Sequence, residues 1–190
     1  MTSTQPSKLL SNLFENIDEE ARLTVLHIGP ALPETVDFFS NFRCKLHFLD
    51  LFGELPIVAE DDVPLSLDKQ FAELMQFPAG TYFDICLFWD IFNYLDADAI
   101  ASFLLTLRPH LRNNSVAHGF AVHNLRSPPV DQVYGVSEAD LLTLRPRAIT
   151  LPGYAPHPQS RLKTLLACFD FDRSVLLADS RLEMVLSAKL

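Results

Sequence analysis

The stretch "LTVLHIGPALPETVDFF", Leu23 to Phe39, predicts the fold more directly than any other part of the chain. Leu23–Ile28 is a short, almost wholly apolar run, which is typical of a strand covered on both faces, as in a parallel sheet. A turn with one glycine and two prolines follows. Pro33 then stands at the first turn of a predicted helix, where a proline is tolerated, and Glu34 lies near the positive end of that helix. A strand–turn–helix unit of this kind indicates an α/β sheet.

The rest of the chain alternates predicted strands with predicted helices. The helices are expected over 7–17, 33–42, 67–76, 96–111 and 158–169, and the strands over 23–28, 44–50, 82–90, 115–124, 169–178 and 180–189. The last two strands are joined by a short turn and therefore form an antiparallel hairpin. This order predicts a three-layer α/β/α sandwich with a Rossmann-like, mostly parallel sheet and a C-terminal antiparallel hairpin.

Length and composition predict one domain over residues 1–190, since a chain with 48% hydrophobic residues can bury a substantial core. Its N-terminal part, 1–21, is expected to be an amphipathic helix. The segment 126–158 holds six of the thirteen prolines. We expect it to be an excursion with little regular structure beyond a short helix near 138–143. Long excursions in compact domains are often functional, so we predict a substrate lid or a partner surface there.

Charge and residue usage exclude several classes of protein. A net charge of −9 and a pI near 5.0 argue against general nucleic-acid binding, which needs a basic surface. The three cysteines are far apart, and the six histidines show no metal-ligand spacing, so no metal site is predicted. The sequence shows neither a secretory leader pattern nor an apolar run of membrane-spanning length, so we predict a cytoplasmic protein that does not enter membranes.

Ligands of open α/β sheets bind at the carboxyl ends of the strands. In this chain those positions are the turn after Ile28, the acid Asp50 and the segment Trp89–Tyr94. An exposed acid at a strand end can also be a simple cap, and a lone tryptophan in an apolar run is often part of the core. Both interpretations of Asp50 and Trp89 stay open at this point.

The chain resembles the class I S-adenosylmethionine-dependent methyltransferases over residues 22–188. The similarity lies in "VLHIG" followed by a helix, in "HFLDL" ending in an acid, in "FDICLFWDIFNYL" followed by a helix, and in the closing hairpin. The resemblance implies S-adenosylmethionine as cofactor. It also implies a group of site residues. The cofactor-binding candidates are His27, Gly29, Ala31, Asp50, Trp89 and Asp90, and the substrate-side candidates are Asn93, Tyr94 and Arg126.

The first loop departs from the pattern of the family it resembles. That family has an acid before the first glycine and then glycines at alternate positions, which let the backbone approach the cofactor closely. Here the acid position is His27, only Gly29 is kept, and Ala31 and Pro33 replace the later glycines. By the same resemblance, Asp50 is expected to hold the two ribose hydroxyls, because both carboxylate oxygens accept hydrogen bonds.

Two functions therefore remain open. The first is a methyltransferase with a divergent cofactor loop; the second is an inactive pseudo-methyltransferase that serves as a binding or scaffold module. A nicotinamide dinucleotide-binding domain is disfavoured, because Gly29–Glu34 lacks two of the three glycines of the GxGxxG motif. The sequence assigns no catalytic base. It identifies neither the methyl acceptor nor an oligomeric state.

Overall fold

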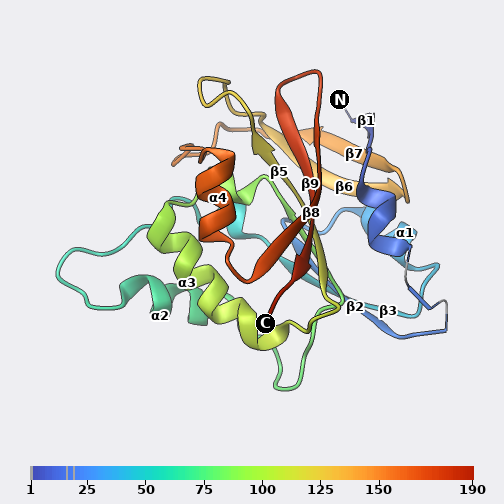
Figure 1. The fold of residues 1–190 in the computed structure, drawn as a ribbon, viewed down its shortest axis with the longest axis horizontal. Coiled ribbons are helices and arrows are strands. Elements are labelled where there is room, and N and C mark those ends of the chain that lie inside the picture. The colour runs from blue at the N-terminus through green and yellow to red at the C-terminus, as the bar shows by residue number, and fades with distance from the viewer. Residues whose placement is uncertain (1, 16, 19) are drawn as a thin grey trace.

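The computed structural model describes residues 2–15, 17–18 and 20–190. Its centre is a six-stranded sheet in the order β3-β2-β4-β5-β9-β8 (Figure 1). The strands are β2 (Leu23–Ile28), β3 (Cys44–Leu49), β4 (Ile85–Trp89), β5 (Val116–Val122), β8 (Phe169–Leu176) and β9 (Arg181–Ala188). The first four run parallel to one another, and β9 is antiparallel to both of its neighbours. The predicted mostly parallel sheet with a C-terminal antiparallel hairpin is confirmed.

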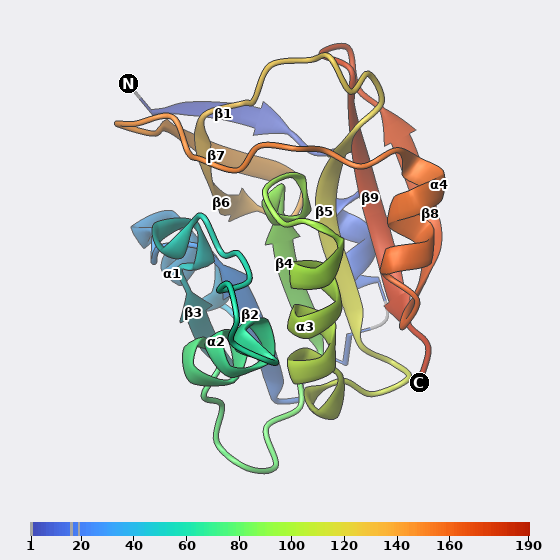
Figure 2. The same cartoon turned by 90° about the vertical axis from the view of Figure 1, so that its left-hand side faces the viewer.

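Helices cover both faces of this sheet (Figures 1 and 2). One face carries α2 (Ser66–Leu74), α3 (Ala97–Leu107) and α4 (Gln159–Leu165), and the other carries α1 (Pro33–Phe39) and the 3₁₀-helix η1 (Leu10–Phe14). Short 3₁₀-turns complete the chain: η2 (Leu51–Glu54), η3 (Ile91–Asn93) and η4 (Arg108–His110). Every residue of β4 is buried, as its apolar sequence requires between two layers. Across the described ranges, no helix combines the length and apolar character needed to cross a membrane.

A second, three-stranded antiparallel sheet lies beyond the carboxyl ends of the parallel strands (Figure 2). It consists of β1 (Ser3–Pro6), β7 (Leu141–Pro146) and β6 (Gln132–Glu138), in that order. The sequence predicts little regular structure in 126–158, which holds for 126–131 and 147–158 but is wrong for the two strands between them. The short helix predicted near 138–143 is also wrong. Glu138 pairs with Leu141 across a two-residue turn. The strand pattern is hard to recognise because the register shifts between Val136 and Glu138.

The predicted N-terminal helix is also wrong. The chain instead forms β1 and the short η1, and Asn16 lies outside the described residues. The apolar spacing correctly indicated burial, because Leu10 and Leu13 are almost wholly inaccessible. The conformation differs because a distant carboxylate, that of Glu183, binds the start of this segment. It accepts hydrogen bonds from the Ser7 hydroxyl and from the backbone N–H of Lys8 at 2.9 Å.

Glu183 is fully buried on β9 and also accepts a hydrogen bond from His118 Nε2 on β5 at 2.9 Å. Burial alone raises the pKa of Glu183, but the hydrogen bonds from His118 and Ser7 outweigh it and lower the pKa to about 2. The carboxylate is thus held in its charged form. Its position therefore ties the N-terminal segment to the centre of the large sheet.

Arg181, two residues earlier on β9, links the second sheet to the main sheet in a similar way. Its guanidinium donates hydrogen bonds to Tyr134 Oη on β6 at 3.0 Å and to the side chain of Gln5 on β1. Asp179 pairs with it at 2.7 Å, and the ring of Phe120 lies 4.9 Å beneath it. The three-stranded sheet is therefore attached to β9 by a buried, paired charge.

Replacing Glu183 by glutamine should lower the free energy of unfolding by about 3 kcal/mol at neutral pH, because it removes the charged partner of a buried network. The native carboxylate has a folded-state pKa below its unfolded value, so its contribution is complete above about pH 5 and disappears as the pH falls toward 2. Urea unfolding of both chains between pH 3 and pH 7 measures this difference. Asp170→Asn, which alters an exposed ion pair, is the matched control and should change stability by less than about 1 kcal/mol. An equal effect of both substitutions would contradict the assignment.

Candidate functional site

The turn after β2 forms the corner where the predicted site begins. Gly29 adopts φ = +130°, a conformation that favours glycine. A Cβ at this position would lie 3.5 Å from His27 Nε2 and 3.9 Å from the ring of Phe52. The space next to the single glycine is thus bordered by two of the protein's own side chains. Ala31 is exposed two residues before α1 begins.

His27 is fully buried and uncharged. Burial lowers its pKa to about 3. The Trp89 indole N–H donates a hydrogen bond to His27 Nε2 at 3.4 Å, so the imidazole's acceptor nitrogen points to the protein interior. Its other ring nitrogen has no partner among the described residues. His27 therefore provides no negative charge at the position where the resemblance implied an acid.

Trp89 is part of a buried aromatic stack. Its backbone φ is +52°, and its ring is stacked on Tyr134 at 5.4 Å between centroids. Tyr134 in turn stacks on Phe120 at 5.3 Å. Tyr134 comes from β6, so the excursion covers the carboxyl end of β4. Of the two interpretations of Trp89, the structure places the ring in the core.

The strand β6 also lies directly on the start of α1. The Thr35 hydroxyl accepts a hydrogen bond from the backbone N–H of Val136 at 3.0 Å. A Cβ at Gly135 would come within 2.9 Å of both Leu32 and Thr35, so only glycine allows this approach without a shift of its neighbours. Arg145 on β7 adds an ion pair with Glu34 at 2.7 Å. The excursion is thus docked onto the predicted cofactor corner rather than projecting into solvent.

Asp50 stands at the carboxyl end of β3 and is exposed. One of its oxygens accepts a hydrogen bond from the backbone N–H of Gly53 at 3.3 Å. The carboxylate borders a pocket of about 320 Å³ between the first loop and the excursion, together with Pro30, Phe52 and Arg147. The Arg147 guanidinium lies 4.2 Å over the ring of Phe52, which fixes its position in the pocket. The carboxylate of Asp50 and the guanidinium of Arg147, which come from distant segments, therefore line the same small pocket.

Asp90, Asn93 and Tyr94 are buried at and just after the end of β4. The Tyr94 ring meets that of the pocket residue Phe52 edge to face at 6.1 Å. Burial raises the pKa of Asp90 to about 7, although the nearby charge of Arg147 opposes the shift. Burial likewise raises the pKa of Tyr94. Asp90 Oδ1 and Tyr94 Oη have no hydrogen-bond partner among the described residues. Unpartnered buried polar atoms are costly, so they indicate a site for a ligand.

The C-terminal part of the excursion, near Tyr154 and Ala155, covers Asn93 and Tyr94. The backbone carbonyl of Asn93 accepts a hydrogen bond from the N–H of Ala155 at 2.9 Å. The rings of Tyr94 and Tyr154 meet edge to face at 5.4 Å. Asp90 is consequently almost inaccessible while the excursion stays in place.

Of the predicted site residues, Asp50 lines the pocket, and Gly29 and Ala31 flank the pocket residue Pro30. Asp90, Asn93 and Tyr94 are buried at the end of β4 and do not line it. The predictions for His27, Trp89 and Arg126 are wrong: the first two contact each other in the core, and Arg126 is exposed in the turn after β5. Sequence reasoning missed Phe52, Tyr134 and Arg147 as site residues. Arg147 had one detectable signal, the surplus of arginines in the proline-rich segment. The two aromatic residues had none, because only the tertiary structure places them beside the first loop.

Comparison of the sequence with protein-family models and with curated proteins finds no match. Solved structures share the fold. The S-adenosylmethionine-dependent methyltransferase from Clostridium acetobutylicum aligns with a TM-score of 0.54 at 11% identity, over 98% of this chain and 93% of that chain. The 1,6-didemethyltoxoflavin-N1-methyltransferase from Burkholderia thailandensis gives 0.53 at 15% identity, over 96% and 78%. The mitomycin 7-O-methyltransferase MmcR gives 0.51 at 15% identity, over 94% of this chain.

The chain therefore has the fold of the class I S-adenosylmethionine-dependent methyltransferases, as the resemblance of its sequence implied. It spans about half the length of two of the similar proteins, 52% of MmcR and 54% of the pyocyanin biosynthetic protein PhzM. At these identities the likeness concerns the fold alone.

Replacing Asp90 by asparagine should stabilise the protein at pH 8 by up to about 4 kcal/mol, because the native fold holds this carboxyl where its charged form is disfavoured. Its folded-state pKa lies above the unfolded value, so the native chain loses this stability as the pH rises from about 4 to 7. The difference in unfolding free energy between the variant and the native chain should grow from about pH 4 to pH 7 and then remain constant. Urea unfolding at several pH values measures it, with the exposed Asp61→Asn as control. A pH-independent difference would contradict the burial argument.

Proposed function

We propose that the chain binds S-adenosylmethionine in the pocket beside Asp50 and transfers its methyl group to an acceptor admitted under the excursion 126–158. The observation that carries the proposal is the arrangement of Asp50, Arg147 and Asp90 around the carboxyl ends of β3 and β4. The fold supports it, since the Burkholderia thailandensis methyltransferase of the same fold was solved with S-adenosylhomocysteine.

The residues present fit two parts of such a cofactor, the ribose and the methionine carboxylate. Asp50 is exposed at the rim, and its two oxygens can accept hydrogen bonds from vicinal ribose hydroxyls. The guanidinium of Arg147 suits the carboxylate of the methionine part, because an arginine binds a carboxylate with two parallel hydrogen bonds. Thus the excursion would supply the anion-binding group in place of the first loop.

When bound, the cofactor supplies an electrophilic methyl group on a sulfonium. The protein's task is to hold the acceptor in line with that methyl group and to take up the proton that the acceptor loses. Asp90 suits the second task, because a general base works best with a pKa near the operating pH and its pKa is about 7. Tyr94 Oη lies unpartnered in the same group and can orient the acceptor. The excursion must open for the acceptor to enter, because Asp90 is only 4% exposed.

A second candidate function is an inactive binding or scaffold module, and one observation favours it. The space around Gly29, where a divergent loop would have to approach the cofactor, is bordered by His27 and the buried ring of Phe52. The docked strand β6 covers the same corner. In this alternative the excursion is a permanent part of the fold and presents a partner surface.

Calorimetry and thermal shift with S-adenosylmethionine and S-adenosylhomocysteine separate the two candidates. At ligand concentrations of 100 times Kd, binding should stabilise the fold by about 2.7 kcal/mol. Asp50→Ala should weaken binding roughly 10- to 100-fold, because charged hydrogen bonds contribute about 1.5–3 kcal/mol. Asp61→Ala, which alters another exposed aspartate, is the control and should leave the affinity unchanged. Absence of binding at millimolar ligand would favour the inactive module.

The proposed role of Asp90 as general base can be tested once a methyl acceptor has been identified. If candidate acceptors are methylated, Asp90→Asn should lower kcat about 100-fold or more without weakening cofactor binding, as expected for a general base. The rate of the native chain should rise with pH through about 7, where Asp90 loses its proton. A pH-independent rate in the native chain would remove Asp90 from this role.

A further inference from the structure

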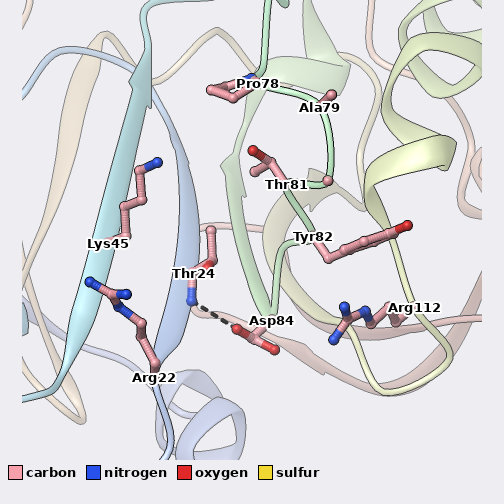
Figure 3. Close-up of a pocket in the computed structure, with 10 residues that line it drawn as sticks. Arg22, Thr24, Lys45, Pro78, Ala79, Thr81, Tyr82, Asp84 and Arg112 are labelled. Atoms are coloured by element: carbon pink, nitrogen blue, oxygen red, sulfur yellow. Dashed lines mark hydrogen bonds between the residues drawn. The ribbon is translucent and has the colours of Figure 1, made fainter.

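A second and larger pocket lies at the opposite end of the sheet, where β2, β3 and β4 begin (Figure 3). Its volume is about 560 Å³, which falls within the range of small-molecule sites. The residues that line it come from the starts of the strands, the loop before β4 and the turn before β5. Those with polar side chains are Arg22, Thr24, Lys45, Thr81, Tyr82, Asp84 and Arg112.

Strand register brings the floor of this pocket together. Thr24 on β2 pairs with Lys45 on the parallel strand β3. Asp84 precedes Ile85, which pairs with Val25, so Asp84 lies beside Thr24 on the other side. Register partners project to the same face of a sheet. Thr24, Lys45 and Asp84 therefore form one polar row across three strands.

Asp84 is firmly anchored in this row. Its Oδ2 accepts a hydrogen bond from the Thr24 backbone N–H at 2.7 Å, and its own N–H donates to the Thr24 carbonyl at 2.8 Å. Its Oδ1 forms no hydrogen bond with any residue that the structure describes. Figure 3 shows the carboxylate between the basic side chains, with Arg22 and Lys45 on one side and Arg112 on the other. One acceptor oxygen is thus available at the centre of the pocket.

The three basic side chains create a local positive charge in a chain whose net charge is −9. Arg22, Lys45 and Arg112 form no ion pair with a described residue. Arg112 is oriented by the ring of Tyr82, over which its guanidinium lies at 4.2 Å. Such stacking leaves the planar edge of the guanidinium free to donate to an anion.

We propose that this pocket binds a small phosphate ester that carries hydroxyl groups. The guanidinium of Arg112 and the ammonium of Lys45 would hold the phosphate, since arginine matches phosphate geometry and lysine acts as a point charge. Asp84 Oδ1 would accept a hydroxyl of the ligand. A carboxylate at the centre and the acidic surface elsewhere disfavour an extended polyanion such as a nucleic acid. This site is distinct from the pocket beside Asp50, which lies at the carboxyl ends of the same strands.

Isothermal titration of the intact chain at low ionic strength tests the proposal, with ribose 5-phosphate as probe and ribose as its neutral counterpart. Ribose 5-phosphate should bind and ribose should not. Lys45→Ala and Arg112→Ala should each lower the affinity about tenfold, and added salt should weaken binding. Asp84→Asn should weaken ribose 5-phosphate binding but strengthen that of inorganic pyrophosphate, because it removes a like charge and a hydroxyl acceptor.

Two controls make the result specific. Arg161→Ala, an exposed arginine on α4, should leave the affinity unchanged. Asp50→Ala should also leave it unchanged, so failure here and failure of the proposed cofactor site can be distinguished. Thermal unfolding of each variant verifies its fold. No binding at millimolar ribose 5-phosphate, an equal loss with Arg161→Ala, or binding of heparin without ribose 5-phosphate would each overturn the proposal.

Discussion

Two charged side chains on one face of β9, Arg181 and Glu183, hold the second sheet and the N-terminal segment on the main sheet. Residues two apart on a strand share a face, so both charges point into the same interior region. A buried charge is costly unless it is paired and hydrogen-bonded. Arg181 therefore requires Tyr134 and Asp179, and Glu183 requires His118 and Ser7. Tyr134 lies on β6, and Ser7 directly follows β1, so these hydrogen bonds fix the positions of both strands relative to β9.

The candidate site depends on this attachment. Because β6 is held by Arg181, its Tyr134 covers Trp89 and its Gly135 lies against the start of α1. The same docking buries Asp90, whose Oδ1 has no partner among the described residues. The buried carboxylate of Glu183, by contrast, has hydrogen-bond partners on both oxygens. This contrast, together with the raised pKa of Asp90, makes Asp90 the candidate for a functional role and Glu183 a structural charge.

Much of the main sheet was predictable from the sequence, because fully buried strands are nearly continuous apolar runs with helices between them. The position of Asp50 followed from the end of such a run, and the structure places it at the rim of a pocket. Arg147 and Phe52 were not predicted as site residues. Phe52 lies in the 3₁₀-turn after β3 and Arg147 directly after β7, and their contact at 4.2 Å joins residues far apart in the chain.

The sequence by itself determined the order of the strands and helices of the main sheet and the polar residues at its strand ends, because burial on one or both faces requires a matching apolar period. Tertiary structure alone decided the conformation of the N-terminal segment and of 126–158. The helices predicted in both segments are wrong for the same physical reason: these segments form hydrogen bonds with each other, with β9 and with the start of α1 rather than within a local helix. Short segments stabilised by distant partners adopt the structure those partners allow, whatever their local preference.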